Sequence, residues 1–126
     1  MALVHHELCF GCGRVNLFGL LVEVEETAPG RVAGRCFVKQ DHQGPDRGNA
    51  HEGIVAAALT EAMALACGLE ARALGLEMSL SHGAPVGGFL DVEARVESRD
   101  GSLADASATA SVNQRVVATA RGRFRS

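Results

Sequence analysis

The sequence predicts an α+β fold in which one helix is enclosed by an antiparallel sheet. Between Ile54 and Leu69 only Thr60 and Glu61 are strongly polar, and most of the other residues are good helix formers. This segment therefore predicts a helix that is apolar on nearly every side. Much of the remaining sequence alternates apolar and polar residues with the period of two that strands have. Such a helix has to be covered, and in a chain of 126 residues only a sheet is left to cover it.

Two strands and a loop are expected before the helix. Residues 19–27 and 31–38 each place an apolar or small side chain at every second position, and Pro29-Gly30 between them predicts a turn, so the pair predicts a hairpin. Residues 39–50 contain Gly, Pro, Asp and Asn without an apolar period, which predicts a loop that ends with Asn49 as the helix cap. The helix is expected to continue through residues 70–72 until Gly75 ends it.

Three long antiparallel strands are expected after the helix, joined by turns at Asp100-Gly101 and Asn113-Gln114. The inner face of the middle strand consists mostly of alanine, which leaves space for the helix to lie close to the sheet. The inward positions of the three strands are Leu90, Val92, Ala94 and Val96, then Ala104, Ala106, Ala108, Ala110 and Val112, then Val116, Ala118, Ala120, Gly122 and Phe124. The prediction is a single domain, residues 1–126, in which five to six curved antiparallel strands wrap one long central helix.

Composition excludes several classes of partner. The net charge of −3 and the absence of Trp and Tyr argue against a nucleic-acid-binding protein, because such proteins use clustered cations and stacking rings. The apolar run is too short for a membrane span and includes Glu61, and the N-terminus does not have the pattern of a signal peptide. We therefore expect a cytoplasmic protein with no nucleic-acid or membrane partner.

Cys9 and Cys12 form a C-x-x-C pair near the N-terminus. The spacing suits half of a zinc site or a redox pair, and His5, His6 or His42 are candidates to complete a tetrahedral site. No second C-x-x-C accompanies the pair. We therefore interpret the segment as a turn-rich lead-in that packs small residues, and no metal is expected.

Glu61 is the first candidate for a functional residue. A carboxylate inside so apolar a helix is costly to bury without a partner, and buried carboxylates in pockets are common in active sites. The structural alternative is that Glu61 pairs with an arginine or faces a gap in the sheet. At the start of the helix, amides from His51 to Ile54 are available for an anion or a polarised carbonyl oxygen. His51 itself is a candidate base or a structural hydrogen-bonding residue.

Three segments carry a family resemblance. His51, Gly53, Ile54, Ala57, Leu59 and Glu61-Ala62-Met63-Ala64 form a pattern that resembles the central helix of hotdog-fold acyl-CoA thioesterases. The segment Cys9-Phe10-Gly11-Cys12-Gly13, followed by Asn16 and Gly19-Leu20, is similar to the lead-in of one bacterial branch, and residues 85–94 are similar to its next strand. The resemblance spans nearly the whole chain. It implies a homodimer joined edge to edge, often paired into a homotetramer, with acyl-CoA bound at the subunit interface and no cofactor beyond the coenzyme A of the substrate.

The helix also departs from the family pattern. The family usually reads H-G-G, where this chain has Glu52 in the middle, and its catalytic Asp falls at Thr60, one residue before Glu61. The resemblance implies Glu61, Glu52, Gly53 and His51 as catalytic candidates, with the amides near Glu52 and Gly53 as oxyanion donors. Asp46 is a further carboxylate. Asn49, Thr60, Ser81 and His82 are the substrate-binding candidates.

Three functions fit these residues. The first is hydrolysis of an acyl-CoA thioester with water activated by Glu61. The second is a hotdog hydratase or dehydratase acting on an enoyl- or hydroxyacyl-thioester. The third is a non-catalytic acyl-CoA-binding protein, which the Thr60 departure favours.

Overall fold

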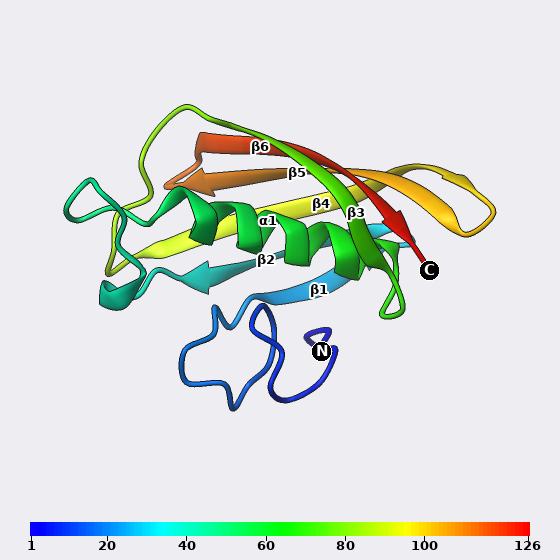
Figure 1. Cartoon of the computed structure of the whole chain (residues 1–126), viewed down its shortest axis with the longest axis horizontal. Coiled ribbons are helices and arrows are strands. Elements are labelled where there is room, and N and C mark those ends of the chain that lie inside the picture. Colours follow the sequence, from blue (N-terminus) through cyan, green and yellow to red (C-terminus); the bar gives the residue numbers. More distant parts are fainter.

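The computed structural model describes residues 1–126 and has one helix packed against one curved, six-stranded antiparallel sheet (Figure 1). The strand order is β1-β2-β4-β5-β6-β3. The elements are β1 (Glu23–Ala28), β2 (Arg31–Phe37), the 3-10 turn η1 (Gln40–His42), α1 (Glu52–Cys67), β3 (Arg72–Leu80), β4 (Phe89–Asp100), β5 (Leu103–Val112) and β6 (Arg115–Arg125). The predicted α+β class and the enclosed central helix are confirmed.

The core lies between α1 and the inner face of the sheet. Ala58, Leu59, Ala62 and Met63 of the helix are 0% exposed. They face the inward positions of the strands, and the four alanines of β5 at positions 104, 106, 108 and 110 are all buried. The small side chains let the helix approach the sheet closely, as the alternation in the sequence predicts.

One predicted inward position in β6 is wrong. Val116 is 45% exposed and Val117 is 2% exposed, the reverse of the predicted alternation. The pairing of β5 with β6 explains the reversal, because Ala110 pairs with Ala118 while Ser111 pairs with Val116. Val117 is therefore the extra residue of a β-bulge, and the bulge turns its side chain toward the core.

The helix boundaries also differ from the prediction. Asn49 is not the cap, because it lies in an extended segment that bridges to Pro85, and His51 caps α1 instead. At the other end Gly68 has a φ of 131° and its amide donates to the carbonyl of Ala64, so the helix stops at Cys67. Residues 70 and 71, which were expected to prolong the helix, precede β3, and Arg72 begins this edge strand, which pairs with β6.

The first 22 residues form loops that lie beside β1 and α1 (Figure 1). Backbone hydrogen bonds hold these loops at several points: Leu3 donates to Val24, Leu20 to Phe10, and Val22 to Gly11. The N-terminal segment is thus tied to β1 and to its lead-in. No helix in the structure has the length and hydropathy that crossing a membrane requires.

Candidate functional site

The start of α1 presents one unpaired backbone donor. The Nδ1 atom of His51 accepts a hydrogen bond of 2.8 Å from the amide of Gly53. The amides of Ile54 and Val55 both donate to the carbonyl of His51, at 2.9 and 3.4 Å. Glu52 is exposed, and its amide has no acceptor within the chain. Among the backbone amides at the start of the helix, the amide of Glu52 is therefore the unpaired donor, and it lies at the positive end of the helix dipole.

The cap also fixes the tautomer of His51. Because Nδ1 accepts a hydrogen bond from the amide of Gly53, the neutral ring carries its own proton on Nε2. His51 is exposed, so it offers a second N–H donor beside the helix start. A role for His51 as a base stays a prediction.

The loop that follows β3 lies against the segment before α1. The amide of Ala50 donates to Ala84, and a Cβ at Gly83 would lie 2.8 Å from the side chain of Asn49. Ser81 donates to the carbonyl of Val117 at 3.2 Å, and His82 contacts the guanidinium of Arg115 through Nε2. Asn49 and the end of β3 therefore reach the same end of the molecule as the helix cap. The substrate-binding roles of Asn49, Ser81 and His82 stay predictions.

Glu61 belongs to a different constellation. Its Oε2 atom lies 2.8 Å from Nδ1 of His5 and 3.5 Å from Sγ of Cys9, and Sγ of Cys12 lies 3.4 Å from the same Nδ1. One ligand atom from each of these four residues lies within 4.8 Å of the others. The His5 and Glu61 side chains are only 12% and 13% exposed. Within the chain Glu61 thus pairs with a histidine, whereas an arginine was the expected structural partner.

The backbone of the N-terminal loop packs directly against the Glu61 carboxylate at Gly11. A Cβ at Gly11 would lie 2.3 Å from both Cδ and Oε1 of Glu61, so only glycine allows the loop to approach so closely. Burial raises the pKa of the Cys12 thiol to about 12, and its hydrogen bond with Glu61 acts in the same direction. Without a cation nearby, the Cys12 thiol therefore stays protonated across the physiological range.

Glu61 and the free amide do not meet in one chain. Nine residues of helix separate Glu61 from Glu52, which is about 13 Å along the axis at 1.5 Å per residue. Thr60, at the position of the family's catalytic Asp, donates its hydroxyl to the carbonyl of Ala56 at 2.7 Å. The polar residues of the helix therefore divide between its start and its third turn.

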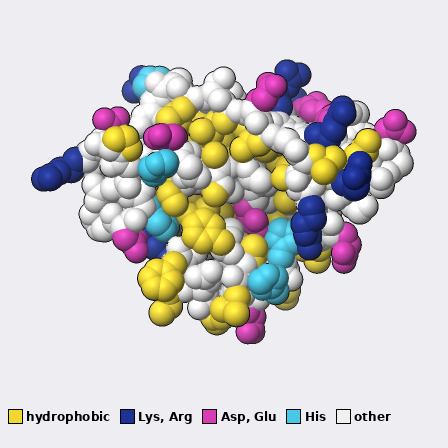
Figure 2. All heavy atoms as spheres, in the orientation of Figure 1, with side chains coloured by type: hydrophobic (Ala, Val, Ile, Leu, Met, Phe, Trp, Pro, Cys, Tyr) yellow, Lys and Arg dark blue, Asp and Glu magenta, His cyan; other side chains and the backbone are white.

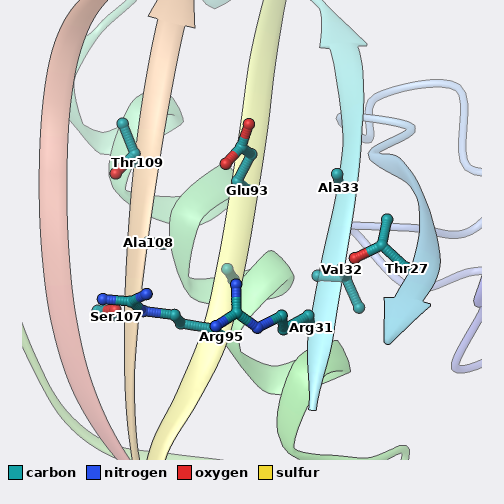
Figure 3. A pocket seen from close by; sticks show the side chains of 10 residues that line it. Thr27, Arg31, Val32, Ala33, Glu93, Arg95, Ser107, Ala108 and Thr109 are labelled. Atoms are coloured by element: carbon teal, nitrogen blue, oxygen red, sulfur yellow. The ribbon is translucent and has the colours of Figure 1, made fainter. Parts of the chain in front are cut away.

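A separate hollow of about 440 Å³ lies on the sheet face turned away from α1. Figure 3 shows Glu93 and Thr109 among its lining side chains, with the helix behind the sheet. Arg31, Arg95 and Ser107 also line it. In the sequence these outward polar positions are indistinguishable from a solvated face, and the hollow lies apart from both helix constellations.

His5 is the residue of the third-turn constellation that the sequence indicated least directly. It lies 56 residues from Glu61, so no local pattern connects the two. The sequence did contain one indication, the spacing His5-x3-Cys9-x2-Cys12. It made His5 one of three candidate partners for the two cysteines. His42, another of those candidates, is buried elsewhere and has no hydrogen-bond partner on either ring nitrogen.

The sequence matches no protein-family model and no curated protein. In fold, the chain is similar to a thioesterase superfamily protein with a TM-score of 0.79 and 22% identity, over 89% of this chain and 60% of that one. It is also similar to zebrafish thioesterase superfamily member 2, with a TM-score of 0.74, 22% identity and coverage of 82% and 80%. The PaaI protein from the E. coli phenylacetic acid degradation operon gives a TM-score of 0.77, 18% identity and coverage of 84% and 79%. At these identities the likeness establishes the architecture: the chain has the hotdog fold that these structures share.

Proposed function

We propose that this protein is a thioesterase that hydrolyses an acyl-CoA, with the thioester carbonyl bound at the start of α1. The observation that carries the proposal is the unpaired amide of the exposed residue Glu52, with the Nε2 donor of His51 beside it. Donors fixed in advance at a developing oxyanion are the largest single contribution to many acyl-transfer reactions. The structural neighbours include a thioesterase superfamily member and a protein from a phenylacetic acid degradation operon, and this similarity supports a thioester substrate.

The proposed reaction is the addition of water to the thioester carbon. A carboxylate takes one proton from the water as the C–O bond forms, and the amide of Glu52 binds the oxyanion of the tetrahedral intermediate. The C–S bond then breaks, and the leaving sulfur receives the proton that the carboxylate holds. The products are a carboxylic acid and coenzyme A, so no cofactor other than the substrate's own coenzyme A takes part.

Two carboxylates are candidates for the proton transfer. The Glu52 carboxylate is exposed at the helix start, next to the donors. The Glu61 carboxylate is about 13 Å further along the helix, so it can act on the same carbonyl only from a second copy of the chain. The two candidates therefore differ in whether the active site needs two protomers.

An assembly of at least two copies is part of the proposal. Strand β3 pairs with β6 on one side only, which leaves its other edge without a partner strand, and Leu74, Leu76 and Leu80 of β3 are exposed. Figure 2 shows hydrophobic side chains gathered over the middle of the face that carries α1, with an acidic side chain and histidines among them. An open strand edge beside apolar surface is the kind of surface that a second copy covers. We propose that two chains form a homodimer and that two homodimers form a homotetramer.

One substitution tests the donor directly. Glu52 is the first residue of α1, the position where proline is best tolerated, and His51 before it already has φ −57° and ψ 140°, which proline requires of its predecessor. Glu52→Pro therefore deletes the amide hydrogen together with the side-chain carboxylate and keeps the helix, so the contribution of the amide is the loss of activity relative to Glu52→Gln. Glu52→Gln is the matched control, because it keeps the amide and removes only the charge.

The assay is thiol release from short, long and aromatic acyl-CoAs. We expect Glu52→Pro to lower kcat by about 10²- to 10³-fold, the usual cost of losing one oxyanion donor. Retention of wild-type turnover by this variant would contradict the proposed site. Among the carboxylates, loss of activity in Glu52→Gln but not in Glu61→Gln assigns the base to the helix start, and the reverse result assigns it to a second copy's Glu61.

The structure also favours one alternative, a protein that binds acyl-CoA without cleaving it. The Glu61 side chain is largely covered by the N-terminal loop, and the hydroxyl of Thr60 is used within its own helix. Saturable binding of acyl-CoA, measured by calorimetry, with no thiol release from any member of the panel would identify this function.

A further inference from the structure

The constellation around Glu61 consists only of groups that bind zinc. An imidazole, two thiols and a carboxylate come together from the N-terminal loop and the third turn of α1. The set mixes the nitrogen, sulfur and oxygen donors that Zn²⁺ accepts in proteins. The only basic group within ion-pair distance of Glu61 is His5. A nearly covered carboxylate with two thiols beside it thus has no lysine or arginine to balance its charge.

The spacing of these atoms is close to that of a tetrahedral site. Zinc bonds of about 2.3 Å to sulfur and about 2.0–2.2 Å to nitrogen and oxygen separate sulfur from nitrogen or oxygen by about 3.6 Å, and nitrogen from oxygen by about 3.4 Å. In the structure Nδ1 of His5 lies 3.8 Å from Sγ of Cys9 and 3.4 Å from Sγ of Cys12. Oε2 of Glu61 lies 3.5 Å from Sγ of Cys9, and its 2.8 Å separation from His5 has to lengthen on binding. The two remaining separations, from Sγ of Cys12 to Cys9 and to Glu61, are within 4.8 Å.

The loop that carries three of the four groups is already in place. The amide of Gly13 donates to the carbonyl of Cys9 at 2.8 Å, and the amide of His5 donates to Sγ of Cys12 at 3.1 Å. Amide hydrogen bonds to sulfur are among the contacts that orient and tune metal-bound thiolates. Gly11 lets the loop lie directly on the Glu61 carboxylate. Little rearrangement therefore separates the observed geometry from a bound ion.

We propose that His5, Cys9, Cys12 and Glu61 bind one Zn²⁺ ion in a closed, four-coordinate site that fastens the N-terminal loop to α1. Binding requires both thiols to release their protons to solvent and Nδ1 of His5 to be unprotonated, so that the proton of the neutral ring lies on Nε2, which is buried without a hydrogen-bond partner. Four protein ligands leave no position for water or substrate, so the ion is structural. The site goes beyond the proposed hydrolysis and uses none of its oxyanion donors. It also makes Glu61 a ligand, which leaves Glu52 as the carboxylate at the helix start.

The first test is metal content and spectroscopy on the full chain, purified without chelators. We expect about one zinc per chain by elemental mass spectrometry after purification or after incubation with Zn²⁺ and gel filtration. Replacement by Co²⁺ is expected to give the intense visible bands of a tetrahedral ion and a thiolate-to-cobalt band in the near ultraviolet. Absence of stoichiometric zinc together with absence of these bands would overturn the proposal. A mass two daltons lower, from a Cys9–Cys12 disulfide that persists in reductant, would overturn it as well.

Matched variants test which side chains bind the ion. His5→Ala is expected to lower zinc affinity at least about 10-fold in competition with a chromogenic chelator, whereas His6→Ala, its exposed neighbour, is expected to leave it unchanged. Cys9→Ser is expected to lose the thiolate band, and Cys67→Ala, which removes a buried cysteine outside the constellation, to retain it. Equal effects of His5→Ala and His6→Ala on zinc affinity would contradict the assignment. If a variant fails to fold, the cobalt spectrum of the wild-type chain tests whether the tetrahedral site exists. Glu52→Pro is expected to keep its zinc, so a failure of the metal site and a failure of the proposed hydrolysis give different results.

Discussion

Leu59→Ala measures how much of the stability comes from the enclosed helix. Leu59 is 0% exposed, at the middle of α1 and against the sheet. The substitution removes three carbon atoms, which costs about 2.4 kcal/mol at about 0.8 kcal/mol for each buried methylene. Partial collapse around the site leaves a cavity that adds about 1 kcal/mol. The expected loss in the free energy of unfolding is therefore about 3–4 kcal/mol.

This loss corresponds to a decrease of roughly 11–15 °C in Tm, because a chain of 126 residues has an unfolding entropy of about 0.26 kcal/mol per kelvin. The assay is thermal and urea unfolding followed by circular dichroism at one fixed protein concentration, since the chain has no Trp or Tyr for fluorescence. Leu69→Ala is the matched control, because Leu69 is 49% exposed and lies beyond the end of α1. We expect the control to lose about 1 kcal/mol or less. Equal losses in the two variants, or a loss below about 1 kcal/mol in Leu59→Ala, would refute the enclosed position of the helix.

Two further predictions concern assembly and pH. Light scattering at micromolar concentration is expected to give at least twice the chain mass of 13.1 kDa, and Leu76→Glu on β3 is expected to lower it; a wild-type mass of one chain would count against the proposed dimer. Burial raises the pKa of the Cys36 thiol from 9.0 to about 12, so above pH 9 the unfolded chain loses this proton while the folded chain keeps it. The contribution of the Cys36 thiol to the free energy of unfolding is therefore expected to be constant below pH 9. Between pH 9 and about 12 this contribution is expected to decrease. Cys36→Val should weaken this slope, and an unchanged slope would show that the thiol is not the cause.

Much of the sheet was predictable because its inner and outer residues alternate strictly. The predicted inward positions of β4 and β5 are buried except Val96 and Val112, which are partly buried, since one face of each strand packs on α1 and the other does not. The reversal at Val116 and Val117 was not predictable from alternation. It depends on a bulge, and a bulge is fixed by the pairing of β5 with β6.

Strand β3 shows how residue preference misled the interpretation. Its residues alternate Leu74, Leu76, Met78 and Leu80 with small or polar side chains, which is a strand pattern. The prediction instead prolonged α1 through residues 70–72 until Gly75, because these residues follow a helix directly, and it assigned no strand to residues 76–80. The φ of 131° at Gly68 was the decisive feature, because it ends the helix four residues before the strand begins.

The candidate sites were predictable as residue types but not as groups. Glu61 was identified because burying a carboxylate in an apolar helix needs an explanation. Its partner His5 is brought there by the path of the N-terminal loop, which no periodicity describes. The hydrogen bond from the Gly53 amide to His51 was equally invisible in the sequence, and it is this bond that leaves Glu52 as the free donor.

The alanine-lined face of β5 determines where a bound acyl chain can run. Ala106, Ala108 and Ala110 are buried and bring the sheet close to helix residues that have no exposed surface, which leaves little room between the two for a hydrocarbon tail. For the proposed acyl-CoA substrate, we expect the tail to extend along the outer side of α1, where Ile54 and Ala57 are only partly covered. In that case, chain-length preference is set by the surface that a neighbouring subunit places over the helix, and substitutions at that contact should alter substrate choice without disturbing the hydrophobic core.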